Sequence, residues 1–243
     1  MSLREDLAVA TRILGRHELL GMFGHVSVLA PEEGRYLVSP GAGNRKDRCT
    51  PEQVFDLGLD DDWKPGMPLE LYMHSEVHRL FPQVGSLVHI HAPGLTQLSA
   101  MEEIPSEVLQ LHAAFWPREV PVFEETDLVR DRDTATALAK LLGNESIALM
   151  RWHGAVVAGA SLSEALYRAL HAEQHARTLL DAFAHGRPLA PLPESVDRAA
   201  VDQTIVNERL LDLHWRYERS YVERAHGGGH GSHAGCGCGG DHD

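Results

Sequence analysis

The chain has 243 residues, and its 35 acidic residues against 22 Lys and Arg give a formal net charge of −13. This acidic balance argues against nucleic acid or an anionic membrane surface as the main partner, because both attract basic patches. No apolar run approaches the roughly 18 residues that a membrane-spanning helix needs. The first residues include Glu5 and Asp6 and lack an apolar segment followed by a cleavage site, so we expect no signal peptide and a cytoplasmic protein.

Hydrophobic periodicity predicts a single three-layer α/β domain with a mixed or antiparallel central sheet. A helix is expected from Ser2, whose spacing to Glu5 is that of a capping box. The other expected helices are 70–81, 93–101, 132–142, 161–184 and 199–224, with a further helix start at 50–53. The expected strands are 25–30, 35–39, 55–59, 86–91, 146–150 and 155–158.

The last 18 residues, 226–243, differ in composition from the rest of the chain. Eight of them are Gly and none is large and apolar, so this segment cannot bury enough surface to offset its ordering entropy. We therefore expect a folded domain over 1–225 followed by a disordered tail over 226–243. The tail carries imidazoles and thiols that bind Zn, Ni or Cu(I), or that could belong to an expression scar. These groups belong to His230, His233, Cys236, Cys238 and His242.

The sharpest local motif is His89-Ile90-His91 on a predicted strand. Residues two apart on a strand point to the same face, so the two imidazoles could grip one metal ion or could simply face solvent. A third ligand is available in His153, which sits at a break between two apolar runs and is followed by Gly154. Glu70, at the start of a predicted helix, is either a residue favoured by the helix dipole or a general acid or base beside the metal.

A competing pair, His171 and His175, has the i, i+4 spacing of zinc-binding helices. Glu173 stands between them in the third place, whereas the metalloprotease motif needs Glu directly after the first His. We interpret both as ordinary helix residues.

Five sequence blocks together resemble the class II aldolase/adducin family, over about residues 5 to 185. They are Gly24-His25-Val26-Ser27, Ser39-Pro40-Gly41, Glu70 with His74, Val88-His89-Ile90-His91, and Arg151-Trp152-His153-Gly154. The resemblance implies an α/β/α domain and a homotetramer with active sites between subunits. It also implies Zn²⁺, or another divalent ion such as Mn²⁺, Co²⁺ or Ni²⁺, on His89, His91 and His153, with Glu70 as the catalytic carboxylate. Family members often lend a C-terminal tyrosine to a neighbouring site, which here would be Tyr217 or Tyr221, although a packed helix face explains both.

The departures from the family pattern bear on the substrate. Sugar-phosphate aldolases of this family usually carry Asn where this chain has His25, and small hydroxyl residues where it has Pro68 and Leu69. Neither Pro68 nor Leu69 donates a side-chain hydrogen bond, which argues against phosphate recognition. The pattern looks more like the decarboxylase-type and adducin-like members. His25 would then contact a substrate carboxylate, polarise a substrate hydroxyl, or close a local hydrogen bond.

The Gly-rich segment that begins at Ser39 and Gly41 could bind a substrate anion through its backbone N–H groups. Arg45 and Lys46 follow in the same segment, and we expect both to be solvated.

The sequence therefore predicts a divalent-metal-dependent carbon–carbon lyase, either an aldolase or a decarboxylase. Its substrate would be a small, non-phosphorylated hydroxy or oxo acid, cleaved through a metal-stabilised enolate. Two alternatives stay open: a dehydratase or epimerase on the same metal site, and a non-catalytic adducin-like scaffold whose tail handles metal.

Overall fold

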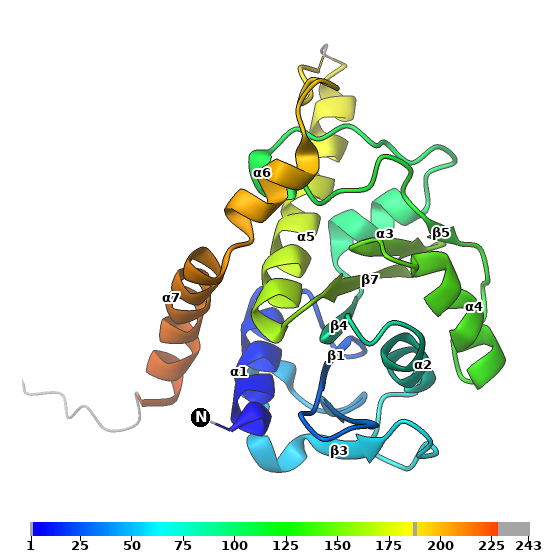
Figure 1. The fold of residues 1–243 in the computed structure, drawn as a ribbon, viewed down its shortest axis with the longest axis vertical. Helices are drawn as coiled ribbons and strands as arrows, with labels where there is room; N and C mark the ends of the chain where they lie inside the picture. Colours follow the sequence, from blue (N-terminus) through cyan, green and yellow to red (C-terminus); the bar gives the residue numbers. More distant parts are fainter. Residues whose placement is uncertain (1, 187–188, 228–243) are drawn as a thin grey trace, which may run out of the picture.

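The computed structural model describes residues 2–186 and 189–227 and is built around one seven-stranded sheet (Figure 1). The strands lie in the order β3-β2-β1-β4-β7-β6-β5. All neighbouring strands are antiparallel except β5 and β6, so the sheet is mixed, as predicted. The strands are β1 (His25–Leu29), β2 (Arg35–Val38), β3 (Phe55–Gly58), β4 (Ser86–Ile90), β5 (Val122–Phe123), β6 (Ile147–Met150) and β7 (Gly154–Gly159).

Seven helices surround the sheet in the described residues. They are α1 (Leu3–Arg16), α2 (Tyr72–Leu80), α3 (Pro93–Ser99), α4 (Arg132–Leu142), α5 (Leu162–His185), α6 (Arg198–Ile205) and α7 (Glu208–Gly227). Three short 3₁₀ turns occupy Lys46–Arg48, Pro51–Gln53 and Leu111–Ala113. None of the helices within 2–186 and 189–227 combines the length and apolarity that a bilayer crossing requires.

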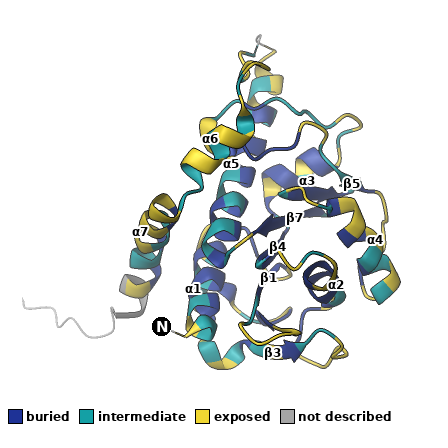
Figure 2. Ribbon diagram, in the orientation of Figure 1, coloured by how far each residue is buried: buried dark blue, intermediate teal, exposed yellow. Residues whose placement is uncertain are grey.

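The two faces of the sheet bury separate cores, which makes the predicted three layers. Val88 and Ile90 of β4 pack into a core shared with α1, α3 and α5, whereas Leu87 packs into a core shared with α2 and α4. Figure 2 shows the sheet almost wholly buried between these helices, with more exposed residues on α6 and α7. Because side chains alternate along a strand, His89 shares the α2 side of the sheet with Leu87.

Side-chain caps define the starts of two helices, of which the cap at Ser2 was predicted. The hydroxyl of Ser2 accepts from the backbone N–H of Glu5, whose carboxylate accepts from the N–H of Ser2, which completes the expected capping box. Ser161 caps α5 in a similar way, by accepting from the N–H of Glu164.

Four details of the sequence prediction are wrong. The helix start at 50–53 is a single 3₁₀ turn, and the helix expected over 70–81 begins only at Tyr72, so Glu70 lies before it. The helix expected over 199–224 is two helices, because Asn207 accepts from the N–H of Leu210 and starts α7 as a new helix. The prediction also lacked β5, whose two residues are too few to show an alternation. Helix α7 is described as far as Gly227, and residues 228–243 lie outside the described residues, so the predicted boundary at 225 stays a prediction.

Candidate metal centre

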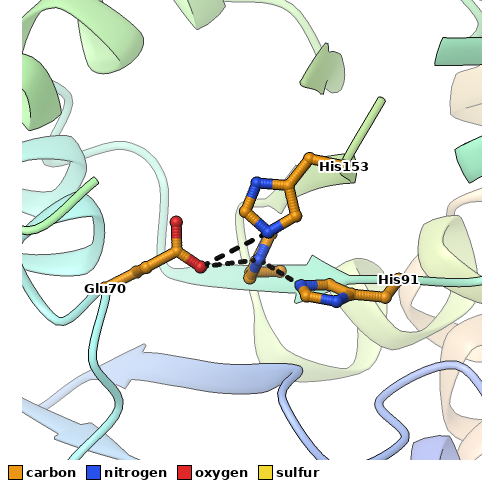
Figure 3. A group of neighbouring side chains, drawn as sticks. Glu70, His91 and His153 are labelled. Atoms are coloured by element: carbon orange, nitrogen blue, oxygen red, sulfur yellow. Dashed lines mark hydrogen bonds and ion pairs between the residues drawn. The ribbon is translucent and has the colours of Figure 1, made fainter. Parts of the chain in front are cut away.

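Glu70, His89, His91 and His153 converge on one point at the end of β4. One ligand atom from each residue lies within 4.8 Å of those of all the others. Figure 3 shows Glu70, His91 and His153 pointing toward one another from three separate segments of the chain. The structure therefore brings together the three predicted metal ligands and the predicted catalytic carboxylate.

The orientation of the His89 ring is set by a neighbouring strand. Its Nδ1–H donates to the carbonyl oxygen of Ala155 on β7, 3.1 Å away. This bond uses Nδ1, so Nε2 is the nitrogen that faces the cluster. Nε2 of His91 lies 2.8 Å from this atom.

Burial favours the neutral form of the other two imidazoles. Burial, followed by the proximity of His89, lowers the pKa of His91 to about 3. The same two causes lower the pKa of His153 below the usual histidine value. Metal ions bind imidazoles through unprotonated nitrogens, so three imidazoles that converge beside a carboxylate suit a divalent ion well.

Glu70 is buried and held at both carboxylate oxygens. Its Oε1 accepts from the backbone N–H of Val129 at 3.0 Å, and its Oε2 lies 3.2 Å from Nε2 of His89 and 3.6 Å from Nε2 of His153. Burial alone would raise its pKa, but His89, His153 and the N–H of Val129 overcome that effect and lower it to about 2. The carboxylate is thus ionised at neutral pH, either as a fourth ligand or as a base beside the ion.

The hairpin between β6 and β7 positions His153. Gly154 has a φ of +146°, and a Cβ at this residue would lie 2.1 Å from the carbonyl oxygen of Ile90, so only glycine fits. Arg151 anchors the other side of the turn by pairing with Glu124 and donating to the carbonyl of Ser99. The Arg151-Trp152-His153-Gly154 block therefore builds the turn as well as supplying a ligand.

A cavity of about 320 Å³ opens beside the cluster. Its polar walls are His25, Glu70 and His91, and its apolar walls come from Phe23, Ala42, Leu69 and Leu128. No Lys or Arg is among these described lining residues.

Ser39 and Gly41, both predicted to bind substrate, instead form hydrogen bonds with backbone groups next to this cavity. Buried Ser39 accepts from the N–H of Val26 at 3.0 Å, and Gly41 donates its N–H to the carbonyl of Gly66 at 2.9 Å. Neither residue lines the cavity of the described chain, so a substrate role for them stays a prediction.

The prediction that Lys46 is solvated is wrong, whereas Arg45 is exposed and pairs with Asp47, as expected. Lys46 is buried and donates to the carbonyls of Pro40 and Gly41. Burial lowers its pKa to about 8. The ammonium of Lys46 thus holds the Gly-rich segment in place through two of its carbonyl groups.

His171 and His175, the competing pair, contact other parts of the fold. His175 lies 2.9 Å through Nε2 from the carbonyl of Glu107, and the His171 ring packs on Tyr167. Neither belongs to a group of metal-type ligands in the part of the chain that the structure describes. Tyr217 and Tyr221 share a 2.9 Å hydrogen bond on α7, and neither lines the cavity of its own chain.

The predicted tail ligands of residues 230–242 lie outside the described residues.

The sequence prediction did not identify the side chains that pack against His25. His74 and His78 stand one turn apart on α2 and, with Ser27, form a buried hydrogen-bonded chain behind His25. The i, i+4 spacing of His74 and His78 was the only sign in the sequence that the two imidazoles share one helix face.

The chain is similar to known proteins in sequence and in fold. A 3,4-dihydroxyphthalate decarboxylase of Arthrobacter keyseri is 28% identical over 91% of this chain and 94% of its own length. A 3-oxo-tetronate 4-phosphate decarboxylase of Escherichia coli is 28% identical over 73% of this chain and 86% of its own length. A crystal structure of an aldolase II superfamily protein from Pseudomonas syringae matches the fold with a TM-score of 0.77 at 21% identity, covering 92% of both chains.

The model of one protein family, described as the Class II Aldolase and Adducin N-terminal domain, matches residues 5–180. These residues include Glu70, His89, His91 and His153, which make up the whole candidate metal centre. The chain therefore belongs to the class II aldolase and adducin family.

Proposed function

We propose that this protein is a divalent-metal-dependent carbon–carbon lyase that decarboxylates a small, non-phosphorylated hydroxy or oxo acid. The observation that carries the proposal is the convergence of three imidazoles and an ionised carboxylate beside a cavity. Relatives named as decarboxylases support this reaction over aldol cleavage.

His89, His91 and His153 would hold the ion, which we expect to be Zn²⁺ or a similar divalent metal. When bound, it would supply Lewis acidity to stabilise the electron pair left behind when a C–C bond breaks. Three uncharged ligands leave the positive charge of the ion undiminished, which favours this chemistry.

Glu70 would move the proton. Its ionised oxygen takes a proton from a substrate hydroxyl and returns it to the carbon that has lost CO₂, so the carboxylate ends each cycle unprotonated. The N–H of Val129 holds the other oxygen, which fixes the direction from which Glu70 approaches.

The cavity lining favours a substrate without phosphate. A phosphate group is bound by Arg, Lys or convergent backbone N–H groups, and the described lining has no Arg or Lys. Pro68 and Leu69 precede Glu70 without offering a side-chain donor, and Leu69 is an apolar wall. A carboxylate next to an apolar or aromatic body suits this space better.

The test is CO₂ release from a panel of acids with added Zn²⁺, Mn²⁺, Co²⁺ or Ni²⁺. The panel contains 3,4-dihydroxyphthalate, small 3-oxo and 2-hydroxy acids, and 3-oxo-tetronate 4-phosphate. We expect CO₂ from a non-phosphorylated member, lost in Glu70→Gln. Aldol fragments, dehydrated or epimerised product, or turnover confined to the phosphorylated acid would each contradict the proposal. Metal binding without any turnover would support a scaffold instead.

We also propose that the chain assembles as a homotetramer in the cytoplasm, with residues 1–225 as its folded domain and the tail over 226–243 handling metal. Exposed apolar side chains near the site support an assembly, among them Phe23, which lines the cavity, and Trp152, next to His153. Sedimentation velocity tests the tetramer, and a monomer at micromolar concentration would exclude it.

A further inference from the structure

Behind the cavity, four buried side-chain groups form one continuous hydrogen-bonded chain. Nδ1 of His25 lies 2.7 Å from Nε2 of His74, and Nδ1 of His74 lies 2.6 Å from Oγ of Ser27. Oγ of Ser27 lies 2.8 Å from Nε2 of His78, whose Nδ1 lies 3.0 Å from the carbonyl oxygen of Val84. All four side chains are at most 2% exposed.

The carbonyl of Val84 sets the direction of every bond in the chain. A carbonyl only accepts, so Nδ1 of His78 carries a proton. Burial lowers the pKa of His78 to about 4, so at neutral pH its Nε2 is a bare lone pair. The hydroxyl of Ser27 must therefore donate to His78, which leaves its oxygen to accept from Nδ1–H of His74.

The same logic continues to the cavity. Burial lowers the pKa of His74 well below the usual histidine value, so with its proton on Nδ1 its Nε2 is an acceptor. Nδ1 of His25 must then be the donor to His74. With the proton of the neutral His25 ring on Nδ1, its Nε2 carries only a lone pair.

This bare nitrogen has no hydrogen-bond partner among residues 2–186 and 189–227, and His25 is a wall of the cavity that contains Glu70 and His91. The chain ends on a backbone carbonyl, which has no proton to supply. It therefore fixes a tautomer and does not conduct protons.

We propose that His25 is a specificity residue, locked by His74, Ser27 and His78 in the tautomer whose Nε2 accepts a hydrogen bond from a substrate hydroxyl. A substrate carboxylate has no proton to donate, so its oxygen lone pairs would repel the lone pair on Nε2. Of the substrate contacts predicted for His25, only the contact with a hydroxyl therefore fits. The proposal rests on the proposed function, because it defines the substrate of that site as an acid with a hydroxyl group that donates to His25.

The direct test is a neutron crystal structure of the zinc-loaded full-length protein at neutral pD. We expect deuterium on Nδ1 of His25, His74 and His78, and the Ser27 deuteron directed at His78. Deuterium on Nε2 of His25, on both of its nitrogens, or an ion bound to its Nε2 would overturn the proposal.

The second test is a binding cycle on the same zinc-loaded protein by titration calorimetry. The probes are 3,4-dihydroxyphthalate, 3-hydroxyphthalate and 4-hydroxyphthalate, which differ by one hydroxyl each. In the wild type, loss of one of the two hydroxyls should weaken binding about threefold to tenfold more than in His25→Ala, the range that one neutral hydrogen bond supports. Ser27→Ala, with its zinc content unchanged, should reduce the same coupling, whereas the exposed control His185→Ala should keep it.

Equal weakening in the wild type and His25→Ala for both hydroxyls would overturn the inference. Neither the neutron structure nor the binding cycle measures catalytic activity. A locked tautomer with hydroxyl coupling but no CO₂ release from any acid would refute the proposed function and leave the role of His25 standing.

Discussion

One carboxylate oxygen of Glu70 accepts a hydrogen bond from the N–H of Val129, 3.0 Å away, while the other lies 3.2 Å from Nε2 of His89. The loop before α4 thus fixes the orientation of the carboxylate toward the three imidazoles. This division separates a structural oxygen from one that is free to act on a proton, and it leads to the first prediction.

Glu70→Gln should lower the rate of CO₂ release by at least about 100-fold, because an amide cannot exchange a proton as the carboxylate does. The fold should survive, since the amide oxygen can still accept from Val129. The three imidazoles remain, so we expect the variant to retain its metal. The matched control is Glu33→Gln, an exposed carboxylate in the turn between β1 and β2. Near-normal turnover in Glu70→Gln would refute its role as the proton carrier.

Gly154→Ala should weaken metal binding and destabilise the fold by about 1–3 kcal/mol, because the new methyl group would push β7 away from β4 and displace His153. Gly58→Ala is the control, since its Cβ would meet nothing closer than 3.7 Å. Chemical denaturation and a competitive metal titration measure the two effects. Equal behaviour of the two variants would show that the turn tolerates a side chain.

Acid should destabilise the metal-free protein through His78. Its pKa is about 4 in the folded state against 6.5 ordinarily, so its stabilising contribution is complete above pH 6.5 and is lost as the pH falls toward 4. The variant His78→Gln should lose about 2 kcal/mol less unfolding free energy than the wild type between pH 7 and pH 4.5. Urea titrations at both pH values, with chelator present, give the comparison. Equal losses of unfolding free energy in the two proteins would mean that the pKa of His78 is not lowered by folding.

Replacing the tail residues His230, His233, Cys236, Cys238 and His242 with serine should raise the metal concentration that gives half-maximal activity, if the tail loads the active site. Activity at saturating metal should not change, because the tail contributes nothing to the proposed chemistry. An unchanged metal requirement would eliminate the loading role.

Much of the fold and the candidate metal centre could be predicted because the signals are local. Alternation along 86–91 placed His89 and His91 on one face of a strand, and the Gly after His153 marked a tight turn. Ser2 and Ser161 have side chains that define helix starts within a few residues of sequence. Such patterns depend only on chain geometry, so they are visible before the chain folds.

The features that were missed depend on contacts between distant segments. Lys46 looks like a solvated charge in sequence, but the fold places two carbonyls around its ammonium. The order of protons from His25 to Val84 exists only once β1 and α2 are packed together. Asn207 is an exception, because it divides the last helix by a local cap that the apolar periodicity on both sides concealed.

The central claim is that His89, His91 and His153 hold one catalytic ion, and metal stoichiometry tests it most directly. The protein should be measured with all six His and Cys residues of the segment 226–243, His226 included, replaced by serine, so that only the domain contributes. We predict one tightly bound divalent ion per chain, lost in His91→Ala and retained in the exposed control His185→Ala. An ion that persists in His91→Ala, or no bound ion in any of the three proteins, would contradict the account.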